Sequence, residues 1–214
     1  EKPTVKTIEV GHGAFRYRVE TDWPSFPIGE EAGEAVAVAC DSRDRVYVFV
    51  RGPRPVRVFE PDGRLVAAWG DGCFARPHGI FIGPGDTVYC TDDFGHQVRA
   101  FTVDGRPLFT LGPGSPSNTG ATSIDYRTIR QSGPPFHYPC NLAVSPSGEL
   151  YVADGYGNAR VHRFAPDGRL LHSWGNPGSG PGEFHVVHGI AVDRDSTVYV
   201  ADRENSRIQR FSPE

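Results

Sequence analysis

Short runs of alternating apolar and polar residues, separated by turn residues, recur along the chain. The clearest pair is YVADGYGNARVHR (residues 151–163) and its near-copy YVADRENSRIQR (residues 199–210). In both, the alternation stops at an Asp, a polar loop follows, and the alternation resumes through an Arg. A period of two is typical of β-strands, so each copy predicts two strands joined by a short loop. No stretch shows a convincing helical period.

These two copies belong to a longer unit that occurs four times, at residues 36–70, 78–112, 140–175 and 188–214. Three of the units contain Asp-Gly between alternating runs, which is a strong hairpin signal, and then end on an aromatic residue or Leu followed by Gly. Four strands in a repeat of about 40 residues predict an all-β chain folded as a β-propeller. The units align on four tyrosines, Tyr47, Tyr89, Tyr151 and Tyr199.

The fourth unit stops before its Asp-Gly hairpin, and an open propeller edge invites aggregation. We therefore expect one domain that forms about two-thirds of a six-bladed ring. The remaining blades would come from the rest of the protein or from another chain. Residues 113–138, rich in Gly, Pro and Ser, are expected to be an insertion over one face, with a short ordered piece at residues 124–130. The run AFRYRVE (residues 14–20) is expected to pair with the last blade.

Charge and cysteine content narrow the function classes. The formal net charge of −4 offers no basic surface for nucleic acid, and no apolar run approaches the length of a membrane span. The four cysteines lack the CxxC spacing of metal sites. Cys40 and Cys90 lie in apolar strand patterns, so we expect buried free thiols there. This usage favours a reducing, cytoplasmic compartment over secretion.

Candidate metal ligands stand where the four units differ. Eleven residues before the aligned Tyr, the units carry Val36, His78, Cys140 and His188. Equivalent positions lie at the same height of a propeller channel, so two imidazoles from alternate blades should converge on the axis. Three such histidines would form an open zinc site, with the third outside this sequence. Alternatively, each His only begins a strand and is hydrogen-bonded in the channel wall.

Three further candidates stand at the exit of the second strand. Arg51 and Arg203 occupy the same repeat position there and could clamp a carboxylate through two hydrogen bonds. Tyr156 could transfer a proton if a metal or an Arg lowered its pKa. Alternatively, both arginines pair with carboxylates at the rim and Tyr156 is a loop aromatic. An Asp recurs one position before this exit, in three of the units: Asp92, Asp154 and Asp202. We expect each of them to cap a turn by accepting hydrogen bonds from backbone amides.

The motifs RPHGI, DGYGNARV, PGEF…HGI and VADRENSRIQ resemble NHL repeats, and in particular those of the peptidyl-α-hydroxyglycine α-amidating lyases and their bacterial relatives. The resemblance runs from about Val36 to the end of the chain. It implies a six-bladed propeller that cleaves an α-hydroxyglycine peptide to the amide and glyoxylate, with zinc and a structural calcium. By position, His78 and His188 match two of three zinc ligands, Tyr156 the catalytic base, and Arg51 and Arg203 the active-site arginines.

The chain departs from the secreted animal members at their two disulfides. The matching positions hold His137 with Gly157, and Tyr199 with Arg210, so neither bridge can form. This favours a bacterial-type relative acting on a small-molecule or peptide substrate. The alternative is a non-catalytic NHL propeller that binds a protein or another ligand. A lactonase-type hydrolase ranks lower, because those propellers bind calcium through Glu, Asn and Asp.

Overall fold

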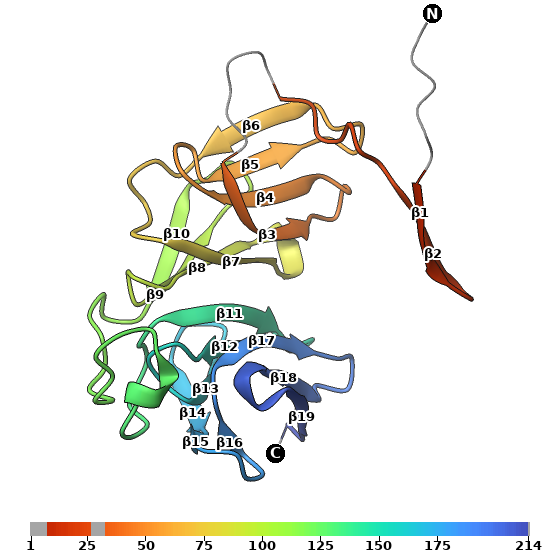
Figure 1. The fold of residues 1–214 in the computed structure, drawn as a ribbon. Helices are drawn as coiled ribbons and strands as arrows, with labels where there is room; N and C mark the ends of the chain where they lie inside the picture. Colours follow the sequence, from red (N-terminus) through yellow and green to blue (C-terminus); the bar gives the residue numbers. More distant parts are fainter. Residues whose placement is uncertain (1–7, 27–32, 214) are drawn as a thin grey trace, which may run out of the picture.

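The computed structural model describes residues 8–26 and 33–213, and these contain four antiparallel sheets of three or four strands that follow one another in chain order (Figure 1). Three sheets have four strands and the last has three. In each sheet, neighbours in sequence are neighbours in space. The first strands of successive sheets contact one another, β3 with β7, β7 with β11 and β11 with β17. This arrangement is a propeller of four blades, and the predicted all-β fold class is confirmed; the six-bladed ring stays a prediction.

The strand bounds follow the repeats. The first sheet contains β3 (Glu34–Cys40), β4 (Val46–Arg51), β5 (Val56–Phe59) and β6 (Leu65–Trp69). The second contains β7 (Pro77–Ile82), β8 (Val88–Asp92), β9 (Gln97–Phe101) and β10 (Pro107–Leu111). The third contains β11 (Pro139–Val144), β12 (Leu150–Asp154), β13 (Arg160–Phe164) and β14 (Leu170–Trp174). The fourth contains β17 (Val187–Val192), β18 (Val198–Asp202) and β19 (Arg207–Phe211).

The connections carry only short elements. Single-turn 3₁₀ helices occur at η1 (Pro84–Asp86), η2 (Tyr126–Thr128) and η3 (Arg203–Asn205). The turn η2 lies within the predicted ordered piece of the insertion. A two-stranded parallel pair, β15 (Asn176–Pro177) and β16 (Glu183–Phe184), precedes the fourth sheet. Within the described ranges, no helix has the length and hydrophobicity needed to cross a membrane.

The hydrophobic core lies between neighbouring sheets. One cluster joins the first two sheets through Phe49 and Phe101, a second joins sheets two and three, and a third joins sheets three and four through Phe184. Most of these residues come from alternating positions of the strands, so the period of two in the sequence is the pattern that stacks the blades. Each large apolar side chain buried in this way contributes about 1.5–3 kcal/mol.

Two expectations from the sequence are wrong. The run AFRYRVE does not pair with the last blade. Its residues form β2 (Phe15–Val19), which pairs with β1 (Ile8–His12) as a local exposed hairpin, because the turn at Gly13 folds the chain back onto an adjacent alternating run. Cys90 is buried as expected, but Cys40 is exposed, because it ends β3, an innermost strand whose residues are largely exposed. All four cysteines are free thiols.

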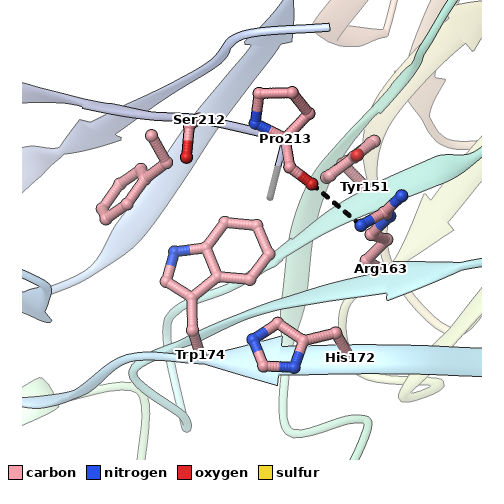
Figure 2. A pocket seen from close by; sticks show the side chains of 7 residues that line it. Tyr151, Arg163, His172, Trp174, Ser212 and Pro213 are labelled. Atoms are coloured by element: carbon pink, nitrogen blue, oxygen red, sulfur yellow. Dashed lines mark hydrogen bonds between the residues drawn. The ribbon is translucent and has the colours of Figure 1, made fainter.

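A large apolar side chain packs on the Asp-Gly turn of each of the first three blades, and in two cases it is the last residue of the preceding blade. These turn glycines have positive φ, and a Cβ atom on any of them would lie 3.0 Å or less from the packed side chain. The three pairs are Trp23 on Gly63, Trp69 on Gly105 and Leu111 on Gly168. Trp174 instead borders a cavity of about 380 Å³, where Arg163 donates to the carbonyl of Pro213 (Figure 2).

Candidate functional site

Both candidate histidines lie at a β-bulge at the start of an inner strand. The residues on either side of His78 pair with consecutive residues of β8, and those on either side of His188 pair with consecutive residues of β18. A bulge of this kind redirects the side chain of the extra residue. The other two inner strands have the same irregularity at Val36 and Cys140. The repeat therefore creates one redirected position per blade, and alternate blades fill it with His.

The recurring Asp fixes the backbone just before each bulge, as the sequence predicted. The three carboxylates are almost completely buried, and each accepts a backbone N–H from the residue three positions before the bulge. These bonds hold the connection between blades against the end of the second strand, so the bulge and its side chain have a defined position. The pairs are Asp92 with Ala75, Asp154 with His137 and Asp202 with His185, at 2.8–2.9 Å.

The structure brings His78, His188, Tyr156 and Arg203 together. The hydroxyl of Tyr156 lies 3.0 Å from Nε2 of His188 and 3.3 Å from Nε2 of His78. Arg203 donates from Nη1 to the same hydroxyl at 3.3 Å, and its guanidinium lies over the Tyr156 ring. The loop with Tyr156 comes close because Gly155 has no side chain: a Cβ there would lie 2.0 Å from the carbonyl oxygen of Val187.

Both imidazoles are held in their neutral form. Burial lowers the pKa of His188 to about 4, with smaller contributions from His78 and Arg203. Burial also lowers the pKa of His78, against a hydrogen bond to the carbonyl of Cys140. In that bond Nδ1–H of His78 donates at 2.8 Å, so Nε2 carries the lone pair. The lone pair of His78 therefore faces the Tyr156 hydroxyl.

Burial raises the pKa of Tyr156, while the Arg203 cation acts in the opposite direction. The phenol is therefore protonated at neutral pH in this arrangement, and its single O–H can donate to only one of the two imidazoles at a time. Because Arg203 donates to the same oxygen, the site already contains a group that stabilises negative charge on Tyr156.

Arg51 lies next to this group but makes no hydrogen bond to it. Its Nη1 pairs with Glu34 at 2.7 Å, and its Nε donates to the carbonyl of Pro77, the residue before His78, at 3.3 Å. The Arg51 cation is nevertheless close enough to lower the pKa of His78. The structure thus places Arg51, a residue of the first blade, at the edge of the site, two blades before Tyr156 in chain order.

Sequence reasoning did not assign the ion pair between Arg76 and Asp93. Asp93 occupies the strand-exit position that holds Arg51 and Arg203 in other blades, and its carboxylate is completely buried. Arg76 donates from Nε to both carboxylate oxygens at 2.9 Å and lies 3.8 Å from the centre of the Phe94 ring. The available signal was the opposite charge of Arg76, just before the His78 strand β7, and Asp93, just after its neighbour β8.

A second unassigned group holds the Tyr156 loop. The hydroxyl of Thr119, in the insertion, donates to the carbonyl of Gly157 at 2.6 Å and accepts from Nδ1 of His137 at 2.8 Å. Gly157 also donates to the carbonyl of His137. His137 and Gly157 are therefore held together by hydrogen bonds at the positions where no disulfide can form. The insertion follows no repeat, so its sequence carried no signal for this role.

The donor set suits a zinc ion, although the described residues supply only part of it. His78 and His188 offer neutral imidazole nitrogens from two neighbouring rings, whose centroids lie 5.2 Å apart. The Nδ1 hydrogen bond of His78 fixes the tautomer in which Nε2 can bind a metal ion. Across residues 8–26 and 33–213, no group of three or more His, Cys, Asp or Glu side chains is arranged to bind a metal ion.

Family comparison finds the NHL repeat in two places, at residues 136–164 and 184–211. These segments cover the third and fourth blades. The chain is 32% identical to human NHL repeat-containing protein 3, over 91% of this chain and 56% of that protein. It is also 31% identical to peptidyl-alpha-hydroxyglycine alpha-amidating lyase 1 of Drosophila melanogaster, over 98% of this chain and 42% of that protein.

A third relative is the peptidylglycine alpha-amidating monooxygenase of Rattus norvegicus, 31% identical over 93% of this chain and 22% of that protein. The chain thus spans between about a fifth and just over half of the length of these curated relatives. Among solved structures, streptogramin B lyase matches with a TM-score of 0.60 at 13% identity, over 97% of this chain and 62% of that one. At this identity the match shows the fold alone.

The repeats, the blades and the relatives agree with one another. The chain is an NHL-repeat β-propeller that resembles the peptidyl-α-hydroxyglycine α-amidating lyases.

Proposed function

We propose that this propeller forms part of a zinc-dependent lyase that cleaves a carbinolamide of the α-hydroxyglycine type and releases an amide and glyoxylate. The observation that carries the proposal is the convergence of two neutral imidazoles and one guanidinium on the Tyr156 hydroxyl. A structural role alone gives no reason for polar side chains of the second and fourth blades to meet at one oxygen of the third. The similarity to a protein named as an amidating lyase supplies the reaction.

His78 and His188 would hold the zinc ion through Nε2, together with a third ligand. When bound, the ion lowers the pKa of a hydroxyl group that it ligates, here the hydroxyl of the substrate. Both rings are neutral at neutral pH because burial lowers the pKa of each. In His78 the Nδ1–H bond to the carbonyl of Cys140 leaves Nε2 with its lone pair free for a metal ion.

Tyr156 is positioned to move the proton of the reaction. In the cleavage, the carbinol O–H loses its proton, the C=O bond of glyoxylate forms, the C–N bond breaks, and the amide nitrogen gains a proton. The Tyr156 oxygen would carry this proton from hydroxyl to nitrogen. Arg203 would stabilise the phenolate, since its hydrogen bond and its charge lower the pKa of Tyr156.

The two arginines would bind the polar end of the substrate. Arg203 lies beside Tyr156, and Arg51 lies beside the start of the His78 strand. A guanidinium group matches a carboxylate through two parallel hydrogen bonds. Held between them, the substrate would present its carbinol carbon to Tyr156.

A direct assay tests the proposal. The purified full-length protein, supplied with zinc, is incubated with an α-hydroxyglycine peptide, and glyoxylate and peptide amide are measured against the uncatalysed reaction. Release of both products in equal amounts, faster than the uncatalysed rate, is the expected result. A rate equal to the uncatalysed one overturns the proposal.

The alternative function is that of a binding module, without catalysis. The observation in its favour is the similarity to a human relative whose name describes its repeats and no reaction. On this alternative, His78 and His188 only line the channel wall, and the assay gives no product.

A further inference from the structure

A cavity with two arginines adjoins the histidine pair. It has a volume of about 330 Å³ and lies between the loop after β4 and the connection from β6 to β7. Its wall includes Arg51, Phe74, Arg76 and Pro77, and Pro77 precedes His78 in the chain. This volume lies in the range of small-molecule sites. None of the residues that line the cavity is acidic.

The Arg76 guanidinium is held in one orientation and keeps N–H groups that are not used in its bonds to Asp93. Nε and Nη2 bind the buried Asp93 carboxylate, and the guanidinium plane lies over Phe94. A guanidinium group has five N–H bonds, so these contacts leave the Nη1 group and one N–H of Nη2. Nη1 has no acceptor among residues 8–26 and 33–213. A fixed pair of parallel donors is the geometry that binds a carboxylate with two hydrogen bonds.

Arg51 adds a second positive group to the same wall. Its partner Glu34 is exposed, with 65% of the side chain accessible, so their ion pair is weak and screened by solvent. Arg51 donates from Nε to the carbonyl of Pro77, the residue before His78, and both residues line the cavity together with Arg76. The Asp93 carboxylate is already bound by Arg76.

We propose that this cavity binds a second carboxylate of the substrate, and that Arg76 makes the site selective for an acidic side chain next to the hydroxyglycine unit. Arg203 and Arg51 keep the role proposed above, at the polar end of the hydroxyglycine itself, and the Arg51 cation adds to the positive charge of the cavity wall. The inference rests on the proposed function for the identity of the substrate, but the binding of a dicarboxylate by the cavity can be measured without turnover.

The experiment measures binding of two stable analogues, N-acetyl-Glu-Gly and N-acetyl-Gln-Gly, to the full-length protein by calorimetry. They differ only in the charge of one side chain. We expect the Glu analogue to bind about tenfold more tightly, which corresponds to about 1.4 kcal/mol. In Arg76→Gln the two analogues should bind equally, with the affinity for the Gln analogue unchanged. Arg106→Gln is the matched control, because Arg106 has 78% of its side chain exposed and should leave the preference intact.

Removal of Arg76 leaves the Asp93 carboxylate buried without its partner, which can destabilise the fold. The double variant Arg76→Gln/Asp93→Asn removes both charges and is measured alongside, with thermal unfolding as the check. Equal affinities in the unaltered protein, no detectable binding of either analogue, or a preference that survives in both variants would each contradict the inference. If the lyase assay fails while the Arg76-dependent preference is found, the cavity stands and the proposed reaction does not.

Discussion

The hydroxyl of Tyr156 lies 3.0 Å from Nε2 of His188, a residue on the next blade. His78, on the preceding blade, lies 3.3 Å from the same hydroxyl through its Nε2. One loop residue of the third blade therefore contacts the redirected His of both neighbouring blades. The third blade itself has Cys140 at the equivalent position, and the carbonyl of Cys140 binds His78. The third blade thus orients His78 and supplies Tyr156, the proposed proton-transfer group.

Replacement of the Tyr156 hydroxyl tests its part in proton transfer. Tyr156→Phe should lower kcat by about 10²-fold or more, the usual scale for the loss of a general acid–base group. The zinc content should stay unchanged, because Tyr156 is not one of the proposed ligands. Steady-state kinetics and metal analysis of the same preparation check both statements. Near-normal turnover in Tyr156→Phe would remove this role.

Loss of the Thr119 hydroxyl should loosen the Tyr156 loop. Thr119→Val leaves the carbonyl of Gly157 and Nδ1 of His137 without partners in a buried place, at a cost of about 1–3 kcal/mol in the free energy of unfolding. Because Gly157 follows Tyr156 directly, kcat should fall while KM changes little. Denaturant unfolding and steady-state kinetics measure the two effects.

Thr119→Ser is the matched control, since it keeps the hydroxyl and should restore both stability and kcat. If Thr119→Val lowers stability and leaves kcat unchanged, Thr119 supports the fold without positioning Tyr156.

The cysteines should differ sharply in reactivity. Burial raises the pKa of the Cys90 and Cys140 thiols, so at pH 8 they remain protonated and shielded from reagents. Cys40 is exposed and should react with iodoacetamide first. Peptide mapping by mass spectrometry before and after denaturation identifies the modified residues. Labelling of Cys90 in the native protein at the rate of Cys40 would contradict the burial of β8 in this blade.

The repeat alignment predicted the blades and the placement of the two histidines for a physical reason. Side chains of a β-strand alternate between the two faces of its sheet, so the period of two in the sequence shows which residues share a face. Equivalent positions of successive blades therefore lie at the same place along the central channel. His78 and His188 therefore meet although more than a hundred residues separate them in the sequence. The capping role of the recurring Asp followed from the same logic, because a residue that recurs at one position in three of the four blades serves the blade itself.

Contacts that occur once could not be read in this way. The Arg76–Asp93 pair joins two connections of a single blade, and Thr119 lies in an insertion without a repeat, so neither position had an equivalent for comparison. The exposure of Cys40 depends on whether another part of the protein covers the inner strand β3. Alternation of apolar and polar residues is the same for a covered strand and for one that is open to solvent. The N-terminal hairpin formed because the nearer partner strand was available.

The zinc content of the full-length protein tests the central claim most directly. Metal is measured by mass spectrometry after purification and after incubation with zinc and removal of the excess, for the unaltered protein and for His78→Ala/His188→Ala. The matched control is His172→Ala, in the wall of the cavity beside Trp174. The account predicts about one zinc per chain in the unaltered protein and in the control, and none in the double variant. The absence of bound zinc from the unaltered protein, or its retention in the double variant, would contradict the account.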